Sequence, residues 1–138
     1  MNPFIVGVDG SETAHRAAVT AADLASKCDA PLHLVTGMKR RGGREVSAGS
    51  DTWHLDPLTD AEQLLAGLRS ELVAPVITSA VVSDDPAKAL CEEAKRLDAD
   101  MIIVGNRRVQ GASRILGSIA TDVLHIAPCN VLVVHTVA

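Results

Sequence analysis

Five short apolar runs recur along the chain, and segments with helical periodicity separate them. The runs cover Phe4–Val8 and residues 32–35, 76–82, 101–104 and 130–134. They are rich in β-branched residues and have little of the polar alternation of a half-exposed strand. This pattern is typical of parallel strands that are covered on both faces.

The intervening segments predict helices that pack on such a sheet. Residues 12–28 place alanines along one helical stripe, which permits close packing on a sheet. Ser11 and Asp85 are predicted helix N-caps, and Pro86 is a predicted first helical residue. In the last helix the apolar residues at helical spacing are Ile119, Val123, Leu124 and Ile126 or Ala127.

Strands alternating with helices predict an α/β domain with a three-layer, doubly wound, five-stranded parallel sheet. We expect the flavodoxin-like strand order 3-2-1-4-5, in which the first and fourth strands flank the switch point. With no repeat, linker or second domain visible, residues 1–138 are predicted to form a single domain. Residues 37–56 differ, since their glycine pairs, basic residues and serines predict a long, mobile loop. Its Lys39, Arg40 and Arg41 either reach a bound phosphate or face water.

Composition excludes several classes of protein. Hydrophobic residues make up 47% of the 138 residues and charged residues 22%, as in a folded globular domain with one substantial core. Phe4 and Trp53 are the only aromatic residues, which argues against stacking on single-stranded nucleic acid. The net charge of −4 provides no general basic surface for DNA. We therefore expect no nucleic-acid partner.

Signals for secretion, membrane insertion and metal binding are weak. No basic segment followed by a long apolar run opens the chain, and no apolar segment approaches the roughly 20 residues of a membrane span. Cys28, Cys91 and Cys129 form no CxxC pair, which favours reduced, structural thiols, and the five histidines are scattered. The sequence predicts a cytoplasmic protein without membrane contact and without a metal site.

The clearest chemical signal follows the fourth apolar run, where Gly105 opens a polar loop with Arg107 and Arg108. Gly117 and Ser118 then begin the last helix. Glycines let the backbone approach a ligand, and the open N–H groups of a helix start attract an anion. A phosphate fits such a corner. In the alternative interpretation Gly105 ends a strand, Ser118 caps a helix and the arginines face water.

A second strand end lies across the predicted crevice from Val104 and the loop that follows it. It reads Val8-Asp9-Gly10-Ser11. Because the carboxyl ends of the first and fourth strands are neighbours in the predicted order, the Asp9 carboxylate can orient a sugar hydroxyl or a base while the loop takes phosphate. In the alternative interpretation Asp9 is a helix N-cap.

Other chemistries find little support. The chain has no GxxxxGK[ST] phosphate loop, and GVDG is not a dinucleotide GxGxxG motif. No Ser-His-Asp arrangement or carboxylate pair can be assigned from spacing, although Asp9, Ser11 and His15 are close in sequence. The pattern favours a regulatory binding protein over an enzyme. Slow ATP hydrolysis is the weaker alternative.

Three stretches of the chain together resemble the universal stress protein family. They are IVGVDGSETAHRA, SDDPAKAL and VGNRRVQGASRILGSIATDVLHIAPCNVLVVHT, and the likeness covers nearly the whole chain outside residues 37–56. The resemblance implies a flavodoxin-like, adenine nucleotide alpha hydrolase-like domain in a cytoplasmic stress response. It also implies a homodimer through the last strand, residues 130–134, and a regulatory protein partner whose identity the sequence leaves open.

Some members of the family bind ATP, so the resemblance implies ATP or another adenine nucleotide, with or without Mg²⁺, as the ligand. Carried over by position, the aspartate after the first strand is Asp9 and the valine on the adenine side is Val35. The phosphate and ribose positions fall on Gly105, Arg107, Arg108, Gly117, Ser118 and Ile119.

This chain departs from the family's pattern of Gly, two residues, Gly, nine residues, then Gly-Ser or Gly-Thr. Arg108 stands where the second glycine is expected, and the segment from there to Gly117 is one residue shorter. Arginine at a positive φ would cost about 1–2 kcal/mol; alternatively, Arg108 adds a charge-assisted phosphate contact. Two hypotheses follow: an ATP-binding homodimer, or a dimeric interaction module that has lost nucleotide binding.

Overall fold

The described residues of the computed structural model, 1–37, 57–82, 85–106 and 117–136, form strands and helices in strict alternation. The strands are β1 (Phe4–Val8), β2 (Leu32–Gly37), β3 (Ile77–Val82), β4 (Met101–Asn106) and β5 (Asn130–His135). The helices are α1 (Glu12–Cys28), α2 (Pro57–Glu71), α3 (Pro86–Leu97) and α4 (Ser118–Ile126). The predicted sequence of five strands and four helices is confirmed over the described residues.

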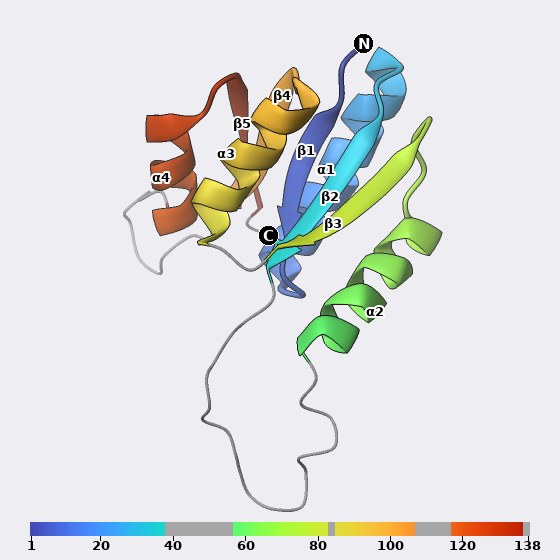
Figure 1. Cartoon of the computed structure of the whole chain (residues 1–138). Coiled ribbons are helices and arrows are strands. Elements are labelled where there is room, and N and C mark those ends of the chain that lie inside the picture. Colours follow the sequence, from blue (N-terminus) through green and yellow to red (C-terminus); the bar gives the residue numbers. More distant parts are fainter. Residues whose placement is uncertain (38–56, 83–84, 107–116, 137–138) are drawn as a thin grey trace, which may run out of the picture.

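All five strands are parallel, and they lie in the order β3-β2-β1-β4-β5, as predicted. Phe4 at the start of β1 pairs with Leu32 of β2 on one side and with Met101 of β4 on the other. Helices α1 and α2 pack on one face of the sheet and α3 and α4 on the other (Figure 1). The doubly wound, three-layer architecture is therefore confirmed.

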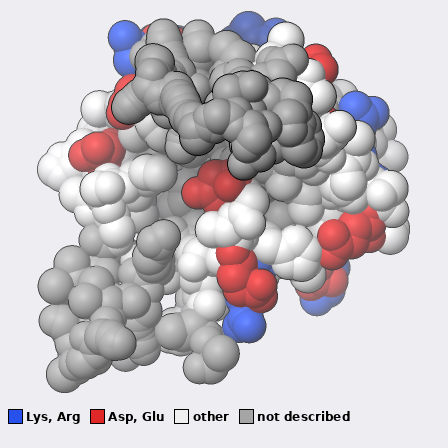
Figure 2. Space-filling model, turned by 90° about the horizontal axis from the view of Figure 1, so that it is seen from below, with Lys and Arg blue, Asp and Glu red and all other residues white. Residues whose placement is uncertain are grey.

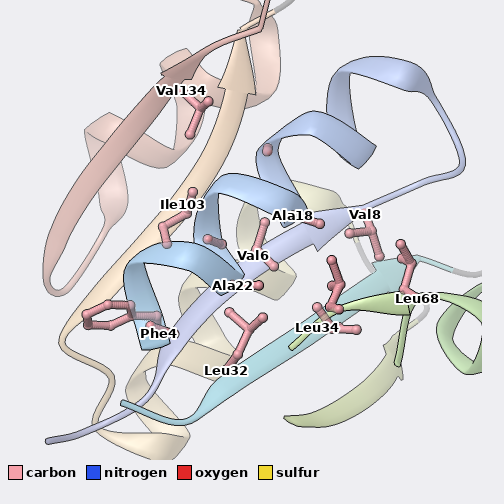
Figure 3. Close-up of a cluster of buried hydrophobic side chains, with 14 of the residues drawn as sticks. Phe4, Val6, Val8, Ala18, Ala22, Leu32, Leu34, Leu68, Ile103 and Val134 are labelled. Carbon is pink, nitrogen blue, oxygen red and sulfur yellow. The ribbon is translucent and has the colours of Figure 1, made fainter. Parts of the chain in front are cut away.

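The core under α1 and α2 is built from alanines of α1 and from larger aliphatic residues, chiefly leucine and valine, with Phe4 as its one aromatic member among the described residues (Figure 3). Ala17, Ala18, Ala21 and Ala25 of α1 are completely buried against the sheet. Alanine lets a helix lie close to strands because it has no side chain beyond Cβ, so the larger residues of β1 and β2 fill the remaining space. The expected alanine stripe is confirmed at these positions.

The opposite face buries Ile5 and Ile102 of the sheet against Leu90 of α3 and Val123 of α4. Cys91 belongs to this core, and burial raises the pKa of its thiol, with the nearby Cys129 adding to the effect. A raised pKa leaves little reactive thiolate at neutral pH. Cys28, Cys91 and Cys129 are free thiols.

Helix ends follow the predicted capping residues. The Ser11 hydroxyl accepts a hydrogen bond from the Ala14 N–H at 3.1 Å, and the Asp85 carboxylate accepts one from the Lys88 N–H at 3.2 Å. Pro86 is the first residue of α3. These hydrogen bonds satisfy N–H groups that have no partner inside the helix. Both predicted N-caps are confirmed.

A polar cluster joins two strands to α3. It consists of His33, Thr78, Glu93 and Arg96. The buried His33 of β2 contacts Thr78 Oγ1 of β3 through Nδ1 at 2.7 Å and Glu93 Oε1 of α3 through Nε2 at 2.9 Å. Arg96 donates two hydrogen bonds to the same carboxylate, at 2.7 and 3.0 Å. These two bonds are the main cause that lowers the pKa of Glu93; partial burial opposes them, and His33 adds a smaller lowering effect.

The predicted strand limits need correction at β3 and β4. β4 continues through Gly105 and Asn106, which pair with Val134 and His135 of β5, so Gly105 does not open the loop. β3 begins at Ile77, one residue later than predicted, and Val76 before it is exposed.

The prediction that the last strand is buried needs correction, and the apolar face of the last helix is only partly covered. β5 is an edge strand in which only Val134 is buried. In α4, Val123 is buried, whereas Ile119, Leu124 and Ile126 are 40%, 48% and 53% exposed. A helix packed near the edge of a sheet has only a narrow strip to bury, so residues on its flanks remain exposed.

Some expectations fall outside the described residues. Gly37 closes β2, but the loop predicted for the rest of residues 37–56 lies outside them, as do Arg107 and Arg108. None of the described helices is both long and apolar enough to span a membrane.

Candidate functional site at the switch point

The switch point lies between the carboxyl ends of β1 and β4. These strands are neighbours, yet the chain leaves β1 into α1 on one face of the sheet, while α4, which follows β4 in sequence, covers the other. In Figure 1 this edge is at the bottom of the view, where the strand arrows end. Open α/β sheets bind their ligands at such an edge because helix amino ends and loops converge on it.

The turn after β1 is held by the Asp9 carboxylate, whose Oδ1 accepts a hydrogen bond from the Ser11 N–H at 2.9 Å. Gly10 between them has φ +86°, a conformation that favours glycine. Ser11, not Asp9, is the N-cap of α1, so the alternative interpretation of Asp9 as the cap was wrong. Asp9 therefore carries an exposed negative charge at the rim of the crevice and also stabilises the turn.

Gly105 is a close-packing position against the first turn of α1. A Cβ at Gly105 would lie 2.9 Å from both Cγ2 and the carbonyl oxygen of Thr13, and 3.2 Å from Cγ2 of Thr136. We expected the missing side chain to admit a ligand; the space it leaves is occupied by α1. The glycine thus brings the amino end of α1 against β4.

The amino end of α4 is exposed at this edge of the sheet. Gly117 is its N-cap, with φ −65°, and provides no side-chain cap hydrogen bond. Ser118 is the exposed first helical residue, so the interpretation of Ser118 as a cap was wrong. An ideal Cβ at Gly117 would meet nothing within 4 Å. The first-turn N–H groups have no partner within the helix and carry the positive end of its dipole.

The three predicted valines are almost completely buried. Val8, Val35 and Val104 are only 4%, 3% and 4% exposed and belong to the two cores. Val35 lies two positions before the end of β2, with its side chain in the core under α3. Val35 and Val104 therefore offer a ligand little side-chain surface.

A cleft of about 270 Å³ adjoins the Asp9 turn between α1 and α2. His15 Nε2 on its wall contacts Glu71 Oε2 at the end of α2, at 2.7 Å. The residues that line the cleft come from β1, the turn, α1 and α2: Val8, Gly10, Ser11, Glu12, His15, Leu64 and Leu68. The lining combines apolar side chains from β1 and α2 with polar groups of the turn and α1.

Charge at the described part of this edge is mainly acidic. Figure 2 looks onto it and shows acidic side chains toward the middle of the described surface, with basic ones nearer the rim. Among the described residues, no group of three His, Cys, Asp or Glu side chains lies close enough to hold a metal ion. A phosphate placed here needs positive charge from elsewhere, and the sequence offers Arg107 and Arg108 between β4 and α4.

Comparison with known proteins decides the family. The sequence model of the Universal stress protein family matches residues 1–135. The chain belongs to this family.

Relatives within the universal stress protein family differ in length. A universal stress protein of Mycobacterium tuberculosis is 35% identical over 140 residues, covering 99% of this chain and 49% of that protein. A universal stress protein A homolog of Coxiella burnetii is 30% identical over 123 residues, covering 83% of this chain and 81% of the homolog. The chain thus spans about half the length of the mycobacterial relative.

Solved universal stress protein structures share the fold. One, a universal stress protein in complex with cAMP, has 27% identity and a TM-score of 0.74, covering 99% of this chain and 98% of that one. A universal stress protein from Archaeoglobus fulgidus has 23% identity and a TM-score of 0.72, covering 98% and 94%. The latter likeness supports the fold alone.

Sequence reasoning missed three residues that shape the candidate site. Asn106 Oδ1 accepts a hydrogen bond from the Gly117 N–H at 3.1 Å, and the Thr136 hydroxyl donates to the Asn106 carbonyl at 2.8 Å. Thr13 occupies the space that a Cβ at position 105 would need. An asparagine after a strand was the only visible signal, and its partner lies eleven residues away, beyond any local pattern.

Proposed function

We propose that this chain is a homodimeric regulatory protein of the stress response that binds an adenine nucleotide, with ATP as its ligand, at the β1/β4 switch point in a cytoplasmic setting. The observation that carries the proposal is the placement of the Asp9 turn and the uncapped amino end of α4 at one edge of a universal stress protein fold. The cAMP complex of the 27% identical structure supports a nucleotide as the ligand class.

The site suits the two ends of a nucleotide differently. The open N–H groups at Ser118 and Ile119 suit phosphate oxygens, whereas the Asp9 carboxylate accepts hydrogen bonds from a sugar hydroxyl or a base amino group. Asp9 would repel a bare polyphosphate, and Mg²⁺ commonly bridges one or two carboxylates and substrate phosphates. We therefore expect ATP to bind more tightly as its magnesium complex.

Substitution of Gly117 by alanine or of Asp9 by asparagine is expected to weaken ATP binding about tenfold, roughly 1.4 kcal/mol each. Alanine fits the φ of −65° at Gly117, where a Cβ meets nothing in the protein but obstructs a ligand. Asparagine can retain the hydrogen bond from the Ser11 N–H while removing the charge. Calorimetric titration of nucleotide-stripped protein, with and without Mg²⁺, measures both effects. Unchanged affinity in both variants would place the ligand elsewhere.

A second candidate function is a dimeric interaction module without a nucleotide, and Arg108 favours it because this residue replaces a glycine of the family pattern. The Arg108→Gly protein separates the two functions. Tighter ATP binding by this variant means that the arginine obstructs the site, and weaker binding means that it contacts phosphate. Binding by neither protein at millimolar ATP favours the interaction module.

The homodimer in this proposal forms through β5 and the neighbouring exposed side of α4. β5 is an edge strand with half-buried Val131, Leu132 and Val133, and an unpaired edge is a template for a second strand. The exposed Ile126 lies at the end of α4, just before this strand in sequence. Pairing of two copies would cover both features.

The Ile126→Lys protein is expected to shift toward the monomer by at least tenfold in dimer dissociation constant, since a lysine at a buried interface must lose its hydration. Sedimentation equilibrium measures the shift. Val19→Lys is the matched control, because Val19 is 44% exposed on α1, on the opposite face of the sheet. An unchanged dimer dissociation constant in Ile126→Lys would contradict the proposed interface, and so would a wild-type protein that is monomeric.

A further inference from the structure

Asn106, the last residue of β4, is fixed through both its backbone and its side chain. Its carbonyl accepts the 2.8 Å hydrogen bond from the buried Thr136 hydroxyl. Its Oδ1 accepts the 3.1 Å hydrogen bond from the Gly117 N–H at the N-cap of α4. The side chain therefore ties the amino end of α4 directly to the end of β4.

The neighbouring Gly105 determines how closely the amino end of α1 approaches β4. Its missing Cβ lets the first turn of α1 lie against β4, with Thr13 in contact. Two consecutive residues of one central strand thus locate the amino ends of both helices that flank the crevice. A shift in either contact would change the width of the crevice.

We propose that Asn106 is a positioning residue for the nucleotide, an inference that rests on the proposed function. Since Gly117 gives its N–H to Asn106, the N–H groups of Ser118, Ile119 and Ala120 are the ones that the first turn of α4 directs toward phosphate. Asn106 sets where these groups point, and it does not itself contact the ligand.

The neutrality of asparagine is part of this role. An aspartate at position 106 could accept the same hydrogen bond, and a carboxylate beside a helix amino end is favourable for the helix. Its negative charge would, however, reduce the positive electrostatic potential at the amino end of α4 and so weaken the attraction for a phosphate. The amide provides the acceptor without the competing charge, so alanine and aspartate at this position are expected to impair binding for different reasons.

Three variants test the proposal by amide hydrogen exchange at Gly117, thermal unfolding and calorimetric titration with MgATP. Asn106→Ala is expected to speed exchange at Gly117 at least tenfold and to weaken ATP binding about tenfold. Asn106→Asp is expected to keep the Gly117 amide protected while weakening ATP binding at least tenfold at low salt, with partial recovery at high salt because salt screens the repulsion.

Thr121→Val is the matched control, because its hydroxyl donates to the Gly117 carbonyl at 3.0 Å in the same helix start. Valine removes this bond but leaves the Gly117 N–H contact, so stability falls while ATP affinity stays within twofold of wild type.

The outcomes separate the two proposals. Wild-type affinity in Asn106→Ala despite fast exchange at Gly117 would overturn the positioning role, and wild-type affinity in Asn106→Asp would overturn the role of charge. If Asn106→Ala does not fold, the aspartate variant still tests the proposal, since it keeps the contact. Absence of ATP binding by the wild-type protein overturns the proposed function itself, whether or not Gly117 is protected by Asn106.

Discussion

The Gly105→Ala protein is expected to be less stable than wild type by about 1–3 kcal/mol, the range for forcing an extra methyl group into a packed interior. The added Cβ would lie 2.9 Å from the Thr13 carbonyl oxygen, which is backbone and cannot rotate away. Either α1 moves from β4 or the strand end shifts, and both change the crevice. Urea unfolding measures the loss of stability, and titration with ATP measures the accompanying loss of affinity.

Gly117→Ala is the matched control for stability, because a Cβ there meets nothing within 4 Å and φ is −65°. Its unfolding midpoint should remain close to wild type. Addition of Thr13→Ala to Gly105→Ala should recover only part of the stability, since one of the two 2.9 Å contacts is with the Thr13 backbone. A Gly105→Ala protein as stable as wild type would mean that α1 does not lie this close to β4.

The Glu93→Ala protein is expected to lose about 2–3 kcal/mol at neutral pH, because a buried polar group loses its partner. His33 is 4% exposed, and its Nε2 contacts the Glu93 carboxylate at 2.9 Å. An ionised carboxylate only accepts hydrogen bonds, so Nε2 donates, and its removal leaves this N–H without that acceptor. Thermal and urea unfolding at neutral pH measure the loss.

The same carboxylate predicts an acid-dependent part of the stability. The pKa of Glu93 is lowered in the folded protein, chiefly by the hydrogen bonds from Arg96. Its stabilising contribution is therefore complete above the pKa of the unfolded chain, roughly 4.3, and is lost as pH falls through the lower folded pKa. The difference in unfolding free energy between wild type and Glu93→Gln should shrink as the pH falls below about 4.

Arg96→Met is the matched control for this pH dependence. It removes the two hydrogen bonds from Arg96 but leaves the contact between His33 and Glu93. Its stability at neutral pH should change less than that of Glu93→Ala, because the Arg96 side chain is 60% exposed. Its acid dependence should become weaker. Wild-type acid dependence in Arg96→Met would mean that Arg96 is not what lowers the pKa of Glu93.

The candidate site is built largely from backbone and short side chains. Gly10 permits the Asp9 turn, Gly105 permits the approach of α1, and Gly117 leaves the start of α4 open. The cleft beside it supplies apolar surface from Leu64 and Leu68.

Local patterns determined the elements and their order. Apolar runs and helical periodicity depend on neighbouring residues, so the strands, the helices, the caps at Ser11 and Asp85 and the strand order 3-2-1-4-5 all followed from the sequence. The resemblance to the universal stress proteins followed from extended motifs and is confirmed by the family match over residues 1–135.

The tertiary structure decided what depends on residues far apart in the chain. The sequence could not show that Gly105 accommodates Thr13, that Asn106 holds Gly117, or that His33 lies between Thr78 and Glu93, because these partners meet only when the sheet and helices assemble. For the same reason it could not show that Ile119, Leu124 and Ile126 remain exposed. Periodicity indicates that a helix has an apolar face, but the width of the surface it meets determines how much of that face is buried.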